Sequence, residues 1–168
     1  MPNSADSKSV TAATTHALQF DWQLSFSREP TQLASDYWRS CLNGRAMPTR
    51  ADLNPSAMRK FTPHIGLVDI RRDTVQPQYF VRRAGGQWED VFGPITGRFV
   101  HDFLPPEIEV RWRKVFDAVC EKKAPLRMTT GIELQGKQWL TMEMLVAPLG
   151  ESGEPNMLLV AFDAWGRH

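Results

Sequence analysis

Hydrophobic and polar residues alternate strictly near the N-terminus, between residues 18 and 26. Apolar side chains occupy every second position, which is the two-residue period of a β-strand. The apolar positions are Leu18, Phe20, Trp22, Leu24 and Phe26. We therefore predict a strand over residues 18–26 with one apolar face, and that face needs a cover. Residues 1–15 are small and polar and are expected to form a disordered tail.

Further along the chain, apolar residues recur three or four positions apart, as on one side of a helix. Asn43-Gly44 suits the end of the first such segment, and Asn54 suits the start of the second as a cap. Residues 97–104 are expected to be irregular. The predicted helices span residues 31–42, 54–61, 87–92 and 105–123.

Five more segments have the length and composition of strands, and short turns separate most of them. They span residues 64–71, 78–84, 126–134, 138–149 and 156–163, with a turn at Gly136. Links of hairpin length predict antiparallel pairing. The expected class is α+β, with helices gathered on one face of an antiparallel sheet. We divide the chain into the tail, an N-terminal extension over residues 16–44 and a domain over residues 45–165.

Several short segments of this domain occur in a familiar order. Phe92-Gly93, Gly97-Arg98 and the run from Asp102 to Glu107 are similar to the segment that leads into the long helix of the PAS fold. Upstream, the segments 48–52 and 80–85 resemble a stand-alone PAS subfamily found mainly in α-proteobacteria. The resemblance covers residues 31–163 and leaves out the strand at 18–26.

This resemblance implies a five-stranded antiparallel sheet with helices over one face, to which the N-terminal strand and helix are added. PAS domains bind haem, flavin or small metabolites between sheet and helices, or bind nothing and mediate dimers. The subfamily is linked to bacterial signalling.

Charge and composition exclude several functions. The net charge is +1, so no overall field attracts nucleic acid or an anionic membrane, and we predict neither partner. No apolar run reaches membrane-spanning length. Cys41 and Cys120 lack metal-ligand spacing and are expected to be reduced thiols. We expect a cytoplasmic protein.

The sequence contains no motif of a phosphate-binding loop or a serine nucleophile. No two histidines lie at ligand spacing, so we predict no catalytic residue and no metal site. His101 precedes the long helix, in the region where haem-binding PAS proteins carry an iron ligand; the alternative is a loop or capping residue. Glu143 lies on the predicted outer sheet face, where Arg82 is one candidate partner.

Methionine and aromatic residues dominate the predicted interior between sheet and helices. Methionine fills irregular spaces and adapts to ligands, so these positions could line an apolar pocket; the alternative is a filled core. The candidate lining residues are Val81, Phe92, His101, Phe103, Phe116, Met128, Thr130, Met142 and Met144. A small apolar ligand suits this lining; no cofactor is predicted, and haem is not expected.

We therefore expect a stand-alone PAS-type sensory or protein-interaction module without catalytic output, which binds a small ligand, a signalling partner protein or both. A homodimer is predicted, because the apolar face of residues 18–26 could pack near Trp139 and Leu145 of its own or a second subunit. Two alternatives remain: a small cone-shaped α+β enzyme acting on an apolar small molecule, and a ligand-free dimeric adaptor.

Overall fold

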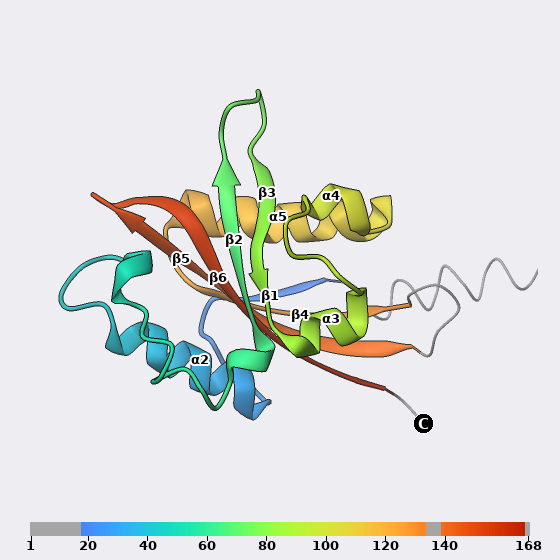
Figure 1. Cartoon of the computed structure of the whole chain (residues 1–168), viewed down its shortest axis with the longest axis horizontal. Coiled ribbons are helices and arrows are strands. Elements are labelled where there is room, and N and C mark those ends of the chain that lie inside the picture. Colours follow the sequence, from blue (N-terminus) through green and yellow to red (C-terminus); the bar gives the residue numbers. More distant parts are fainter. Residues whose placement is uncertain (1–17, 134–138, 167–168) are drawn as a thin grey trace, which may run out of the picture.

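A six-stranded antiparallel sheet forms the centre of the molecule in the computed structural model, which describes residues 18–133 and 139–166 (Figure 1). The spatial order of the strands is β1-β4-β5-β6-β2-β3, so β1 and β3 are the edge strands. The strands are β1 (Gln19–Asp21), β2 (Ile65–Arg71), β3 (Gln78–Ala84), β4 (Leu126–Ile132), β5 (Leu140–Glu151) and β6 (Glu154–Gly166).

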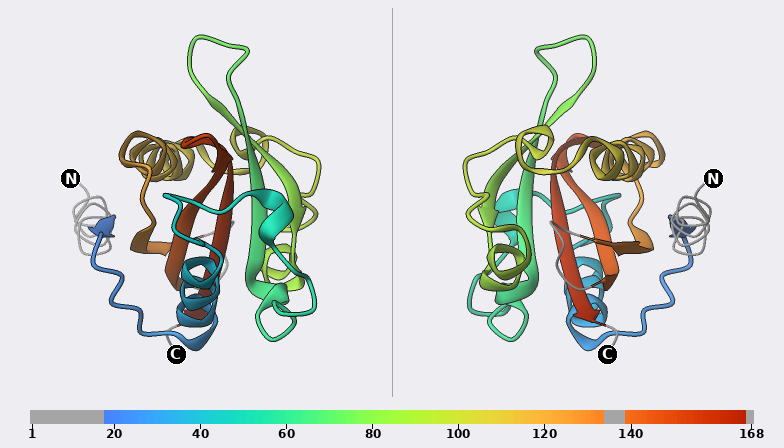
Figure 2. Two further views of the ribbon diagram at one scale, coloured as in Figure 1. Left: turned by 90° about the vertical axis from the view of Figure 1, so that its left-hand side faces the viewer. Right: turned by 90° about the vertical axis from the view of Figure 1, so that its right-hand side faces the viewer.

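Helices cover both faces of this sheet. The helix α5 (Pro106–Lys122) lies over one face, and α2 (Glu29–Ser40) lies over the opposite face, against β5 and β6 (Figure 2). The shorter elements are the 3₁₀ turns η1 (Arg50–Asp52) and η2 (Thr62–His64) and the helices α3 (Gly86–Phe92) and α4 (Val100–Phe103). The prediction of helices on one face is therefore correct for α3 to α5, and the N-terminal extension covers the other face.

Alternation along the strands divides their side chains between two apolar clusters. The inner cluster joins the sheet to α3, α4 and α5. Its members include Trp88, Trp112, Phe116, Met144 and Phe162, all at most 2% exposed. The outer cluster joins the sheet to α2 and to the segment 41–64. Its buried members include Ala34, Trp38, Leu145, Ala147 and Leu159. The sheet is thus buried on both sides, which explains the apolar residues on both faces of β5.

The predicted strand over residues 18–26 is wrong in length, because β1 ends at Asp21. The Asp21 carboxylate accepts hydrogen bonds from the backbone N–H groups of Gln23 (2.9 Å) and Ser25 (2.8 Å). These bonds turn the chain, and Leu24 has a φ of 62°, outside the strand region. The chain therefore leaves the sheet edge at Trp22 and crosses to the outer face.

Two other predicted segments differ as well. Residues 55–61 form consecutive turns in place of a helix, since Arg59 and Phe61 donate their N–H groups three residues back, to Ser56 and Met58. The Asn54 side chain still accepts the Ser56 N–H (2.9 Å), as a cap does. Residues 97–104 contain the one-turn helix α4. The predicted tail at 1–15 and the turn at Gly136 lie outside the described residues.

Backbone packing at the start of α3 requires a glycine. Gly85 has an ordinary φ of −75°, but a Cβ there would lie 2.5 Å from the carbonyl oxygens of Thr62 and Pro63. The Gly85 N–H also donates to the Ile65 carbonyl (2.9 Å). A Cβ on the adjacent Gly86 would meet nothing within 4 Å.

We therefore predict opposite effects for two neighbouring substitutions. Gly85→Ala forces two backbone carbonyls apart and lowers the free energy of unfolding by at least about 2 kcal/mol. Gly86→Ala is neutral or stabilises α3 by up to about 1 kcal/mol, since alanine loses less backbone entropy in a helix. Urea denaturation of both variants tests this; equal destabilisation would contradict the close approach at Gly85.

Candidate functional site

The residues predicted to line a ligand pocket mostly meet in the inner cluster. Val81, Phe116 and the three methionines are buried members of it, while Phe92 and Phe103 are half-buried and pack against it. Thr130 is 4% exposed, and it lies opposite Met142 in the β4–β5 ladder. The structure thus brings these predicted pocket residues together from α3, α4, α5 and the sheet.

His101 does not join them. Its side chain is 38% exposed, stacks on Phe99 with ring centroids 5.2 Å apart, and has Nε2 3.4 Å from an Asp102 carboxylate oxygen. The prediction that His101 lines the interior is therefore wrong. Across residues 18–133 and 139–166, no three His, Cys, Asp or Glu side chains gather as metal ligands would.

Two tryptophans at the centre of the inner cluster differ in their polar contacts. The Trp88 indole N–H donates to the His64 carbonyl (2.9 Å). Trp112 is 1% exposed, and within the described part of the chain its indole N–H has no hydrogen-bond partner. Its ring makes edge contacts with Trp88 (5.6 Å) and Phe92 (5.3 Å). Trp112 therefore offers a desolvated donor inside a mainly apolar core.

A second polar group lies between α5 and β3. The Tyr79 hydroxyl donates to Asp117, and burial together with this bond raises the pKa of Tyr79 above its usual range. Burial raises the pKa of the Cys120 thiol to about 11. The thiol is therefore protonated at neutral pH and is a poor nucleophile. Neither Cys120 nor Cys41 forms a disulfide.

Glu143 in β5 is the principal buried charge on the outer face, with no exposed surface. Its Oε2 accepts from the Ser27 N–H (2.9 Å) and hydroxyl (2.8 Å). Its Oε1 accepts from the Arg28 N–H (2.9 Å) and from the Thr31 hydroxyl (2.6 Å). The Arg127 guanidinium of β4 completes the site at 2.9 Å. Arg82 takes no part, because it binds Asp69 instead.

These contacts make Glu143 the N-terminal cap of α2. The first N–H groups of a helix lack internal partners, and Arg28 at the cap position supplies no side-chain acceptor. A carboxylate from another element fills this role and also meets the positive end of the helix dipole. The N-terminus of α2 is therefore fixed to the middle of β5.

The charge of Glu143 is stable in this position. Burial alone raises the pKa of Glu143, but the hydrogen bonds from Thr31, Ser27 and Arg127 outweigh it, and the net pKa lies below the ordinary 4.5. Because hydrogen bonds to the ionised form exceed the desolvation cost, the carboxylate remains charged at neutral pH.

Further ion pairs surround this centre. Arg28 pairs with Asp163 of β6 at 2.8 Å, and its guanidinium lies 4.4 Å from the centre of the Trp165 ring. Arg127 also approaches Asp21 of β1 at 3.5 Å. The N-terminal extension is thus connected to β4, β5 and β6 through charged side chains.

The five apolar residues of the predicted strand are divided between the two faces. Leu18 and Trp22 pack against the inner cluster, and Leu24 and Phe26 pack against the outer cluster that contains Leu145. Phe20 is 40% exposed. Trp139 is half-buried just before β5. Four of the five residues are therefore covered within one chain. The expectation that this apolar face needs a second subunit as its cover is thus wrong, while the homodimer itself stays a prediction.

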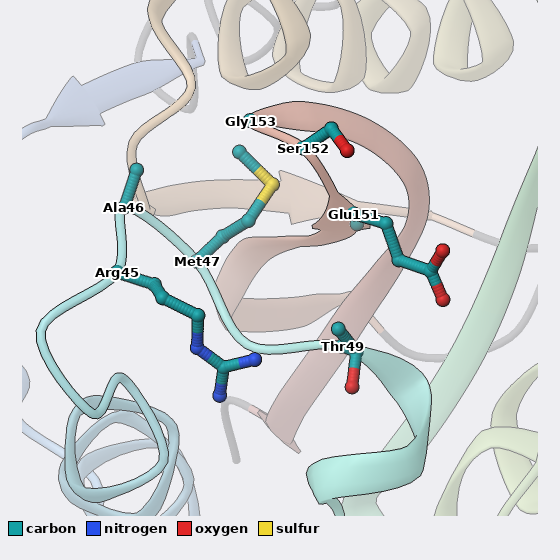
Figure 3. A pocket seen from close by; sticks show the side chains of 8 residues that line it. Arg45, Ala46, Met47, Thr49, Glu151, Ser152 and Gly153 are labelled. Atoms are coloured by element: carbon teal, nitrogen blue, oxygen red, sulfur yellow. The ribbon is translucent and has the colours of Figure 1, made fainter.

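Of the surface hollows that the described residues line, two have arginine side chains in their walls. The larger of these, of about 350 Å³, lies between residues 45–49 and the β5–β6 turn at 150–153 (Figure 3). Met47 extends into it, and Arg45 stands at its side. Arg45 is already paired with Asp52 at 2.6 Å, so this hollow has little free positive charge. The smaller lies beside β2 and β3, where Arg50 and Arg83 border apolar side chains.

One face of the sheet carries small helices and a long helix, with tryptophans and methionines between them, which defines a small α+β domain. A family model described as PAS domain matches residues 26–162. The chain belongs to the PAS domain family and is a sensory or interaction module of that general kind.

Comparison with solved structures finds similarity to a chain described as an RNA-binding light-oxygen-voltage receptor. The two share 10% sequence identity with a TM-score of 0.46, and the match covers 88% of this chain and 38% of the receptor. This chain therefore spans well under half of that receptor. No curated protein matches the sequence. Of the helices that the structure describes, none combines the length and apolarity of a membrane span.

Replacing the Glu143 carboxylate tests its capping role. Glu143→Gln keeps the volume but leaves Arg127 and part of the α2 N-terminus without an acceptor, so the free energy of unfolding should fall by about 3 kcal/mol at pH 7. Glu154→Gln is the matched control, because Glu154 pairs with Lys123 on the surface and its loss should change little. Equal effects of the two variants in urea denaturation would contradict the cap.

The cost of Glu143→Gln should also depend on pH. The folded-state pKa of Glu143 is lowered, so its stabilisation is fully present above the unfolded value of about 4.5. It is lost as the pH falls through the folded pKa. We expect the difference between wild type and variant, measured by urea denaturation, to be constant from pH 6 to 8 and to shrink below pH 4.5. A difference independent of pH would show that the charge is unimportant.

Proposed function

We propose that this chain is a cytoplasmic bacterial PAS sensor without catalytic output, which binds a small, mainly apolar ligand between α5 and strands β4 and β5. The Trp112 indole N–H carries this proposal. A buried donor without a partner costs about 1–3 kcal/mol, and a ligand with one hydrogen-bond acceptor recovers that cost.

The walls around this donor suit such a ligand. Met128, Met142 and Met144 are fully buried on β4 and β5. Methionine has a flexible, polarizable side chain that can rearrange around a small guest, as happens at adaptable binding surfaces. The ligand would enter by displacing side chains of α3 and α4, where Phe92 and Phe103 are only half-buried.

The available polar groups argue against the enzyme alternative. Of the ionisable side chains discussed above, Glu143 is fully committed to the α2 cap, and Cys120 is held protonated. General acid–base catalysis needs a titratable group near neutral pH within reach of the substrate. The chemistry therefore favours sensing, with the readout passing to a partner protein.

Two matched tryptophan substitutions test the ligand site. Trp112→Phe and Trp88→Phe both remove an indole ring from the inner cluster, but only Trp88→Phe breaks a hydrogen bond in the free protein. In ligand-free protein, Trp88→Phe should therefore be more destabilising, by about 1 kcal/mol. Native mass spectrometry of protein purified from its own host gives the ligand occupancy.

We expect a bound small molecule in wild type, about a tenfold loss of occupancy in Trp112→Phe, and a smaller loss in Trp88→Phe. The same spectra report whether the chain is the predicted homodimer. Wild-type protein without any bound molecule, from several growth conditions, would contradict the sensor proposal and favour the ligand-free adaptor.

A further inference from the structure

The smaller surface hollow has an apolar floor and a positively charged rim. Leu53, Met58 and Leu67 form part of the floor and are at most 7% exposed. The exposed side chains of Arg50 and Arg83 border it. It lies on the outer face, beyond the region that α2 covers, and its volume is about 60 Å³.

An irregularity in strand pairing places Arg83 there. Leu67 lies opposite Arg83, but the next residue, Val68, lies opposite Val81, so β3 contains one extra residue at this point. A bulge of this kind redirects a side chain. Arg82 reaches Asp69 and Arg83 borders the hollow beside Leu67, so two consecutive arginines occupy the outer face.

Asp69 on β2 and Asp52, two residues after Arg50, are already committed to ion pairs. Both oxygens of Asp69 bind Arg82, at 2.7–3.0 Å, and Arg71 is a second partner at 3.4 Å. Asp52 is paired with Arg45. Within residues 18–133 and 139–166, Arg50 and Arg83 have no ion-pair partner. Their charges are therefore free to meet carboxylates from outside the chain.

The size of the hollow decides what it can hold. A cavity that binds benzene has about 150 Å³, so 60 Å³ accommodates a few carbon atoms and excludes haem or flavin. The end of one aliphatic side chain fits this space. A small pocket that takes one apolar anchor, with charged groups around it, is typical of the centre of a protein–protein interface.

We propose that this hollow docks an acidic segment of a partner protein. The segment inserts one aliphatic side chain between Leu53, Met58 and Leu67, and its carboxylates pair with Arg50 and Arg83. This rests on the proposed function, because it identifies the surface through which the sensor meets its partner. It does not involve the inner cluster, so the tryptophan experiment can succeed or fail independently.

A nuclear magnetic resonance titration of the full chain tests the proposal. The probe is acetyl-Glu-Leu-Glu-amide, and the control peptides are acetyl-Glu-Ala-Glu-amide and acetyl-Lys-Leu-Lys-amide. We expect the acidic leucine peptide to shift the amide signals of Leu53, Met58 and Leu67 with millimolar affinity. The alanine peptide should bind at least about tenfold more weakly, and the lysine peptide should leave these signals unchanged.

Variants of the rim give the matched comparison. The double variant Arg50→Glu/Arg83→Glu should lose binding of the acidic peptide and gain binding of acetyl-Lys-Leu-Lys-amide. Lys114→Glu has the same type of charge change at an exposed residue of α5, on the opposite side of the sheet, and should bind like wild type. The gain of binding to the basic peptide excludes misfolding as the cause.

The proposal is overturned if the acidic leucine peptide shifts none of these amides at 10 mM, or if the lysine peptide shifts them equally. Tighter binding of sodium hexanoate than of the peptide would overturn the assignment to a protein segment, since a free carboxylate would then be the better occupant.

Discussion

One buried carboxylate joins the N-terminal extension to the sheet. Glu143 accepts hydrogen bonds from the backbone N–H groups of Ser27 and Arg28 and pairs with Arg127 of β4. A single carboxylate thus binds both the start of α2 and a cation on the neighbouring strand. A buried charge is tolerated only when such partners surround it. This contact supports the outer apolar cluster, because it fixes the N-terminus of α2 to β5, and α2 packs against β5 and β6.

Covering both faces gives the two sides of the sheet different chemical surroundings. The inner face is a dense aromatic and methionine core with one desolvated donor at Trp112, which suits recognition of a small apolar molecule. The outer face is covered by α2 and by the segment 41–64, and Arg50 and Arg83 border a small hollow there, which suits protein contact. The same strands β5 and β6 contribute to both clusters.

Much of the fold follows from local patterns in the sequence. The strand at 78–84 has the predicted bounds, and the long helix agrees within one residue at each end. The alternation in β4 and β5 correctly identified Met128, Met142 and Met144 as facing the helices. The PAS family and its antiparallel sheet were also predicted from the sequence and are confirmed.

The features that the sequence did not predict depend on side chains that bond residues far away in the sequence or bond nearby backbone N–H groups. Ser27 and Glu143 are 116 positions apart, so no local pattern could show the cap. Asp21 fits the alternation of a strand as a polar residue, but its carboxylate accepts hydrogen bonds from the N–H groups of residues 23 and 25, and β1 ends early.

Hydrogen exchange at the Ser27 and Arg28 amides of the wild-type protein tests most directly whether Glu143 holds the N-terminus of α2 on the sheet. The account predicts protection close to that of the β5 amides, because both N–H groups donate to a fully buried carboxylate. Exchange at the rate of an unstructured peptide would contradict it, since the N-terminus of α2 would then be free of the sheet.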